Sequence, residues 1–158
     1  MSSTDARSGQ ASTDGQIDMH LEVDIIPVSD VDQSKQFYQG LGWRLDSDLA
    51  PAKDVRIVQF TPPGSGCSVT FGKGITKAAP GAAEAGLTVT DIESAHYELV
   101  SRGIDASDVW HGPPFPMEAR LSGPDPAHTS YGSFFSFNDP DDNVWLVQEV
   151  TTRLPGRV

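Results

Sequence analysis

Few side chains in this sequence are placed to perform acid–base chemistry. Glu84 opens a short apolar segment, and two of the four histidines, His111 and His128, flank a proline-rich stretch. A carboxyl group on an apolar wall has a raised pKa, because burial disfavours its charged form, and it can then serve as a general base. The histidines would act as acids or as donors to a developing oxyanion. This set predicts isomerisation, epimerisation or elimination next to a carbonyl, unless Glu84 is simply solvated or bonded to a loop amide.

A metal site would need more donors than the pattern supplies. His20 lies at the entry of a predicted strand and His96 on a predicted helix, and no two histidines have the spacing of a ligand pair on one helix. The single cysteine, Cys67, excludes an internal disulfide and is interpreted as a small buried hydrophobe. We predict no cofactor, with a metal held by Glu84, His111 and His128 as the alternative.

An internal repeat reveals the elements that position these side chains. Residues 28–32 (VSDVD) reappear as residues 89–93 (VTDIE), and each copy follows a strand-like apolar run and opens a helix. Ser29 with Asp32, and Thr90 with Glu93, fit the capping box that satisfies free amides at a helix start. The helices are predicted at residues 31–39 and 92–102, with Gly40 and Gly103 ending them.

Three further strand-like segments follow each helix, at residues 43–48, 55–61 and 67–71, and again at 104–110, 132–138 and 144–150. The sequence therefore predicts an α+β domain at residues 19–150. Two tandem βαβββ modules, at about 19–72 and 84–150, would form a curved, mostly antiparallel sheet around a cavity. Residues 1–18 are interpreted as a disordered tail and 151–158 as a C-terminal tail. The proline-rich stretch at 111–131 is interpreted as a lid or binding loop, with a rigid surface excursion without a role as the alternative.

Composition narrows the classes of partner. The formal net charge is −11 and the pI about 4.5, so a nucleic acid or an anionic membrane surface would be repelled. No apolar run approaches the length of a membrane helix, and no signal-peptide pattern opens the chain, so a cytoplasmic location is the default expectation. A small organic ligand or a protein partner remains open.

Two motifs carry a resemblance to a known family. Residues 28–38 (VSDVDQSKQFY), followed by Leu41-Gly42-Trp43, and residues 137–145 (FNDPDDNVW) resemble the glyoxalase, bleomycin-resistance and dioxygenase superfamily, also called vicinal oxygen chelate. Asp142 stands where that superfamily usually has glycine, which is expected to strain or reshape the turn. The resemblance implies sheets curled around a small-molecule cavity and a homodimer, in some members with the cavity shared between subunits.

The resemblance also implies where a divalent metal would sit. The matching positions are Val23, Glu84, Leu146 and one of residues 68–70. Only Glu84 is a strong ligand, and shifting the register by one residue gives no better set. The resemblance therefore implies a member without the usual metal site.

Alternation along the strands puts Val23, Ile25, Glu84, Gly86, Leu146 and Gln148 on the concave face. Aromatic side chains near that face contact either the ligand or the core. The Tyr131 hydroxyl either donates a hydrogen bond to a ligand oxygen, or Tyr131 is a packing residue of the following strand. The predicted ligand-binding residues are Val23, Ile25, Phe71, Trp110, Tyr131, Phe135, Leu146 and Gln148. The hypotheses are a metal-independent lyase or isomerase, a protein that sequesters a drug or toxin and, more weakly, a metal-dependent lyase or dioxygenase.

Overall fold

A computed structural model describes residues 15, 17–113 and 116–157. The first module contains β1 (Val23–Ile25), α1 (Val31–Gly40), β2 (Arg44–Ala52), β3 (Val55–Thr61) and β4 (Ser68–Lys73). The second contains β5 (Glu84–Val89), α2 (Ile92–Ser101), β6 (Trp110–His111), the 3-10 turn η1 (Met117–Ala119), β7 (Leu121–Ser122), β8 (Ser133–Asn138) and β9 (Val144–Glu149). The predicted α+β fold of two βαβββ modules is confirmed. Most of the predicted tail at residues 1–18 lies outside the described residues.

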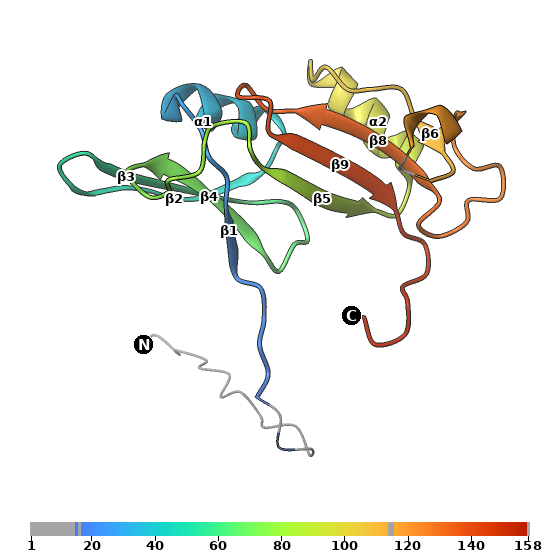
Figure 1. The fold of residues 1–158 in the computed structure, drawn as a ribbon, viewed down its shortest axis with the longest axis horizontal. Helices are drawn as coiled ribbons and strands as arrows, with labels where there is room; N and C mark the ends of the chain where they lie inside the picture. Colours follow the sequence, from blue (N-terminus) through green and yellow to red (C-terminus); the bar gives the residue numbers. More distant parts are fainter. Residues whose placement is uncertain (1–14, 16, 114–115, 158) are drawn as a thin grey trace, which may run out of the picture.

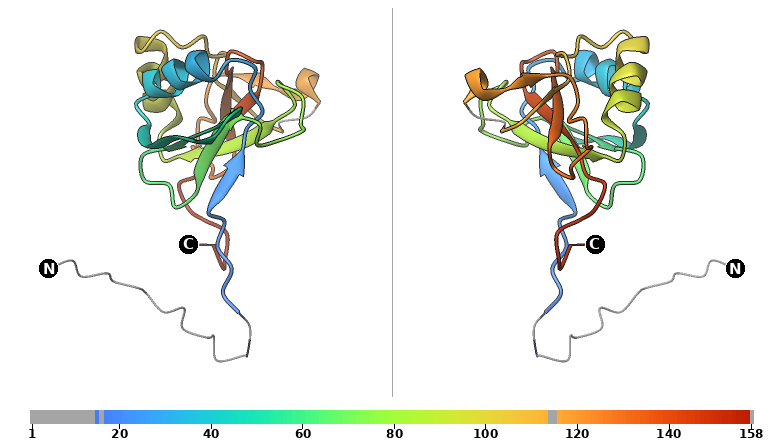
Figure 2. Two further views of the ribbon diagram at one scale, coloured as in Figure 1. Left: turned by 90° about the vertical axis from the view of Figure 1, so that its left-hand side faces the viewer. Right: turned by 90° about the vertical axis from the view of Figure 1, so that its right-hand side faces the viewer.

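The strands form two mixed sheets, where the sequence predicted one. Their orders are β1-β4-β3-β2 and β5-β9-β8-β6-β7. In each sheet the first strand of the module runs parallel to the last, and the other pairs are antiparallel. The modules lie side by side with both helices on one side of the sheets (Figures 1 and 2). The opposite face of both sheets is therefore left without a helical layer.

Both helices start at the predicted residue, and each ends one residue away from the prediction. Asp30 and Asp91 are the N-caps, and their carboxylates accept from the amides three residues further on. The predicted caps were wrong: the Ser29 hydroxyl instead donates to Asp141 across the chain. The short Asp side chain reaches the third amide and also complements the helix dipole. At the end of α1 it is Gly42, with φ of 81°, that adopts the left-handed conformation, while Gly103 does so after α2 as predicted.

A continuous core lies between the helices and the sheets and joins the two modules. The Tyr38 hydroxyl of α1 donates to Asp139 at 2.8 Å and accepts from the Trp145 indole at 3.1 Å. Asn143 donates to Asp139 and to the Pro27 carbonyl, both at 2.8 Å. All these side chains are buried, so the first module is fastened to the β8–β9 turn of the second. Asp142 in that turn has φ of 67°, the conformation that glycine would adopt there.

The described part of the long loop after β6 is folded back onto the second module. Its short strand β7 pairs with β6, and its last residues are bonded to the end of β9 and to the C-terminal tail. Over the described part of the chain, neither helix has the length and apolarity that crossing a membrane requires.

Candidate ligand-binding site

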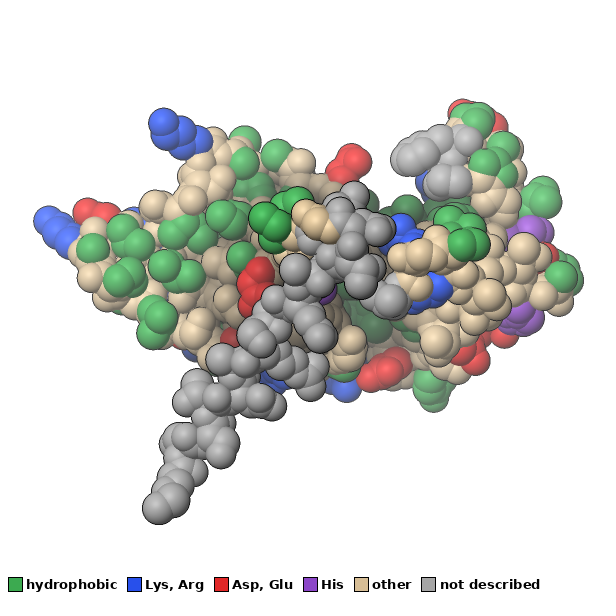
Figure 3. Space-filling model, turned by 90° about the horizontal axis from the view of Figure 1, so that it is seen from below, with side chains coloured by type: hydrophobic (Ala, Val, Ile, Leu, Met, Phe, Trp, Pro, Cys, Tyr) green, Lys and Arg blue, Asp and Glu red, His purple; other side chains and the backbone are tan. Residues whose placement is uncertain are grey.

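The face of the sheets without helices carries most of the candidate ligand-binding residues of the second module. In the second sheet Gly86 is paired with Leu146, and Leu146 with Ser136, so their side chains project to the same face. Glu84 lies two residues before Gly86 on that face, and Gln148 two residues beyond Leu146. The predicted concave set of β5 and β9 is therefore on one face, opposite to the helices. Seen from below, hydrophobic side chains gather on this face over β2 and β3 of the first module (Figure 3).

A pocket of about 360 Å³ opens on this face of the second module. Trp110 of β6 forms one wall and stacks on Phe134, with ring centroids 5.6 Å apart. The guanidinium carbon of Arg120, from the long loop, lies 4.0 Å from the centroid of the Trp110 ring, in cation–π geometry. Through Arg120 the loop contributes to the lining of the pocket. The lining residues are Glu84, Ala85, Gly86, Trp110, Arg120, Ser136, Val144 and Leu146.

The indole of Trp110 has an unusual feature for a buried side chain. Trp110 is 6% exposed, and its Nε1 finds no hydrogen-bond acceptor among the described residues. Leaving a buried donor unpaired costs about 1–3 kcal/mol. Since nearly all buried polar groups in folded proteins are paired, this orphan donor distinguishes Trp110 from the other residues of the pocket wall.

The first module presents a more polar wall on the same face. Val23 and Ile25 are 42% and 48% exposed, and their β4 partners are Ser68 and Thr70. The Thr61 and Ser68 hydroxyls are 2.6 Å apart, and Asp46 accepts from Thr61. Val23 and Ile25 are therefore exposed on this wall, as the sequence predicted, but they lie outside the Trp110 pocket.

The structure does not bring Glu84 together with the two histidines. Glu84 pairs with Val144 at the start of β9, whereas His128 bonds to Glu149 at its end, on the helix side of the sheet. His111 follows Trp110 on β6 and so faces away from the pocket, with its Nδ1 2.7 Å from the Gly123 carbonyl. The predicted acid–base set is thus separated by about 16 Å of strand and by the sheet itself.

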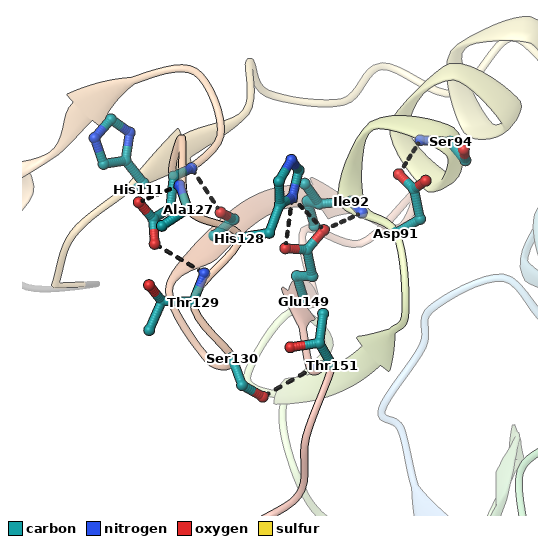
Figure 4. A network of polar contacts seen from close by, with 12 residues as sticks. Asp91, Ile92, Ser94, His111, Ala127, His128, Thr129, Ser130, Glu149 and Thr151 are labelled. Atoms are coloured by element: carbon teal, nitrogen blue, oxygen red, sulfur yellow. Dashed lines mark hydrogen bonds and ion pairs between the residues drawn. The ribbon is translucent and has the colours of Figure 1, made fainter.

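His128 instead forms a polar contact with a structural role. Its Nδ1 is 3.0 Å from the carboxylate of Glu149, which is 1% exposed and also accepts from the Ile92 amide at 2.9 Å (Figure 4). The hydrogen bond to Glu149 and that residue's charge raise the pKa of His128 above its ordinary value. This histidine therefore anchors the end of the loop to the first turn of α2.

Four other predicted ligand-binding residues make contacts outside the Trp110 pocket. Phe71 and Phe135 are fully buried under the helices, which is the core alternative that the sequence left open. Phe135 also borders a separate apolar cavity of about 210 Å³ on the helix side. The Tyr131 hydroxyl accepts from the Leu154 amide at 3.2 Å, and the Gln148 amide donates to the Tyr131 carbonyl at 2.9 Å.

The family's metal positions can be tested against the observed register. Val23 pairs with Ser68, Glu84 with Val144, and Gly86 with Leu146. Of these residues only Glu84 is a strong ligand for a divalent transition metal, and such a site needs at least three. Within the described ranges no three acidic, histidine or cysteine side chains are grouped to hold a metal ion. The residues at these positions therefore do not fit the divalent metal site of the family.

Four pocket residues, Ala85, Arg120, Ser136 and Val144, escaped the sequence analysis. Ser136 and Val144 would have been found by extending the alternation of β8 and β9 across the register. Arg120 carried no such signal, because its place over Trp110 depends on the path of an irregular loop.

Comparisons with known proteins agree with this fold. The family model described as Glyoxalase/Bleomycin resistance protein/Dioxygenase superfamily matches residues 19–147. A search of curated protein sequences found no match. The structure of TnmS3, an antibiotic binding protein from Streptomyces sp. CB03234, is 25% identical with a TM-score of 0.61, covering 84% of this chain and 96% of that one.

Two other solved structures are similar. A superfamily member from Sphaerobacter thermophilus DSM 20745 is 25% identical with a TM-score of 0.60, covering 83% of this chain and 97% of that one. The fosfomycin resistance protein FosX from Listeria monocytogenes shares the fold at 12% identity and a TM-score of 0.56, covering 86% and 94% of the two chains.

Proposed function

This chain belongs to the Glyoxalase/Bleomycin resistance protein/Dioxygenase superfamily, and from that premise we propose that it binds and sequesters an aromatic, drug-like compound without the help of a metal. The observation that carries the proposal is the Trp110 pocket, in which an aromatic wall and a buried, unpaired indole N–H lie side by side. A planar ring would pack beside the indole, and a small shift of the side chains that bury Nε1 would let an oxygen of the compound accept from it.

The chemistry of the pocket supports binding over turnover. Its walls are mainly apolar, and Arg120 and Ser136 supply donors at its edge. The 25% identity to an antibiotic binding protein supports the same class of ligand. Glu84 is exposed at the edge of the pocket and has neither of the predicted histidines beside it.

A metal-independent lyase or isomerase is the second candidate, because Glu84 lines the same pocket. The two candidates are separated by recovering the compound after incubation with the protein. An unchanged mass and a Glu84→Gln variant with unchanged affinity support sequestration. A chemically altered compound, with conversion lost in Glu84→Gln, would establish the enzyme instead.

We also propose that the protein is a homodimer. Ile17, Met19 and Leu21 are 82%, 90% and 78% exposed on an extended arm that continues into β1. They alternate with polar residues as one face of a strand does, so the arm presents an apolar stripe that a second copy would cover. Sedimentation of the wild type as a dimer, and of a variant with serine at these three positions as a monomer, is the expected result; a monomeric wild type contradicts it.

The binding proposal is tested with a panel of aromatic antibiotics, using the shift in melting temperature and calorimetry. We expect at least one compound to raise the melting temperature, since a ligand of the folded state stabilises it by mass action. Trp110→Ala should abolish the shift, whereas Tyr97→Ala, which removes a 76% exposed aromatic ring on α2, should not. Equal binding by both variants would refute the pocket assignment.

A further inference from the structure

A second, more polar cavity lies on the same face and adjoins the Trp110 pocket. It encloses about 510 Å³ between the turn at residues 62–67, β5 and the C-terminal tail. Gly86 lines both cavities, so they meet along β5. None of the described residues that line the second cavity is acidic. They are Pro62, Pro63, Gly64, Ser65, Gly66, Cys67, Gly86, Leu87, Thr88, Arg153 and Arg157.

Two arginines of the tail converge on this cavity. Arg153 places a guanidinium nitrogen 3.5 Å from the Thr88 hydroxyl, on the concave face of β5. By contrast, Arg44, Arg56 and Arg102 each form an ion pair. Within the described part of the chain, neither Arg153 nor Arg157 has a carboxylate partner. In a protein with 22 acidic and 11 basic residues, two guanidinium groups that line one cavity whose described lining holds no acidic residue are arranged to receive an external anion.

The register gives the distance between the two cavities. Trp110 pairs with Phe134, Phe134 with Gln148, and Gln148 with Thr88, so the indole and Thr88 stand level on strands that are three positions apart. At about 4.8 Å per strand the separation is about 14 Å. Gly86 lies two residues before Thr88 on β5, lines both cavities and adds no side chain where they meet. A β-carbon placed there would meet only the Leu146 carbonyl, at 4.0 Å.

We propose that the ligand is an extended aromatic compound with an anionic group, and that Arg153 and Arg157 bind that group while the ring lies at Trp110. This inference rests on the proposed function and specifies its ligand class. Guanidinium groups bind carboxylate, sulfonate or phosphate oxygens through parallel N–H donors. The tail thereby becomes part of the binding site and closes one end of the groove.

The experiment compares biphenyl-4-carboxylate with the neutral biphenyl-4-carboxamide by isothermal titration calorimetry on the full chain. The wild type should bind the carboxylate more tightly. The double variant Arg153→Gln/Arg157→Gln should lose about tenfold in carboxylate affinity, the size expected for a partly solvated charge-assisted hydrogen bond, and should leave amide binding unchanged. The matched control is Lys53→Gln/Lys77→Gln, which removes the same charge at two exposed lysines outside both cavities and should bind both compounds like the wild type.

Two contrary outcomes are distinguishable. If both compounds bind the wild type equally, or if the arginine and lysine variants weaken carboxylate binding to the same extent, the anion subsite is refuted while the aromatic pocket stands. If neither compound binds the wild type, the proposed function fails with these probes and the inference falls with it.

Discussion

His128 and Glu149 are held together by a hydrogen bond of 3.0 Å, although one side chain is half exposed and the other is 1% exposed. His128 has φ of 48° and lies near the end of the long loop, whereas Glu149 ends β9 and bonds to the first turn of α2. This contact fastens the loop that carries Arg120 to the frame of the second module. The loop is therefore anchored at the end far from the pocket.

The His128 contact predicts a pH dependence of stability. Because the hydrogen bond to Glu149 raises the pKa of His128 in the folded state, the contact stabilises the fold fully below the unfolded value of about 6.5. That contribution is lost as the pH rises through the raised pKa. Melting curves from pH 5.5 to 8.5 should show that the melting temperature of the wild type exceeds that of His128→Gln at low pH, and that this difference shrinks as the pH increases. The exposed His20→Gln is the control, and a constant gap between wild type and His128→Gln would contradict the prediction.

Replacement of Glu149 separates its hydrogen bonding from its charge. Glu149→Ala leaves the amide of the buried Ile92 without its acceptor and should lower the free energy of unfolding by about 1–3 kcal/mol. Glu149→Gln retains an amide oxygen that can accept from Ile92 and should cost clearly less. Urea denaturation measures the free energy of unfolding of both variants. Equal losses would show that the Ile92 hydrogen bond is not the source of the destabilisation.

Trp110→Phe tests the unpaired indole N–H. The change keeps an aromatic wall against Phe134 but removes a buried donor that has no acceptor among the described residues. The cost of lost volume and the relief of about 1–3 kcal/mol of unpaired-donor penalty oppose each other, so stability should change by less than about 1 kcal/mol. Affinity for an oxygen-bearing aromatic compound should fall about tenfold, as measured by calorimetry. A large loss of stability with unchanged affinity would refute a role for the donor in binding.

Gly86→Val tests the groove along β5. The new side chain would project from the concave face with no clash closer than 4.0 Å, and valine suits a strand, so the fold should be as stable as the wild type. The side chain would nevertheless stand where the two cavities meet and should abolish binding of an extended ligand. Thr88→Val, on the same face of β5 but outside the Trp110 pocket, is the matched strand control for stability. Retained affinity in Gly86→Val would place the ligand elsewhere.

Tyr38→Phe tests the coupling of the two modules. The variant removes the hydroxyl that bridges Asp139 and the Trp145 indole, and leaves both buried groups short of a partner. The free energy of unfolding should fall by about 1–3 kcal/mol. Circular dichroism and tryptophan fluorescence should still report one shared transition, because Asn143 and the aromatic core continue to join the modules. Two separate transitions in the wild type would contradict this coupling.

Local signals in the sequence determined the fold. The repeated helix starts, the alternation of the strands and the turn at residues 139–143 each act over a few residues, and together they required two βαβββ modules. The same alternation correctly put Glu84, Gly86 and Leu146 on one face, because the direction of a side chain in a strand follows from the backbone alone. The choice between Ser29 and Asp30 as cap was decided by which side chain found a partner elsewhere in the fold.

Only the tertiary structure decided which candidate side chains meet. The sequence put Glu84, His111 and His128 in one set because all three are titratable, but the register of β9 holds them at different ends and on different faces of the sheet. Phe71 and Phe135 are buried in the core under the helices. The sequence could not decide this, because an aromatic residue in a strand can face either side of the sheet, and only the packing of the helices shows which side is the core. The contacts of Arg120 and Arg153 depend on irregular chain paths, for which no periodic pattern exists to be read.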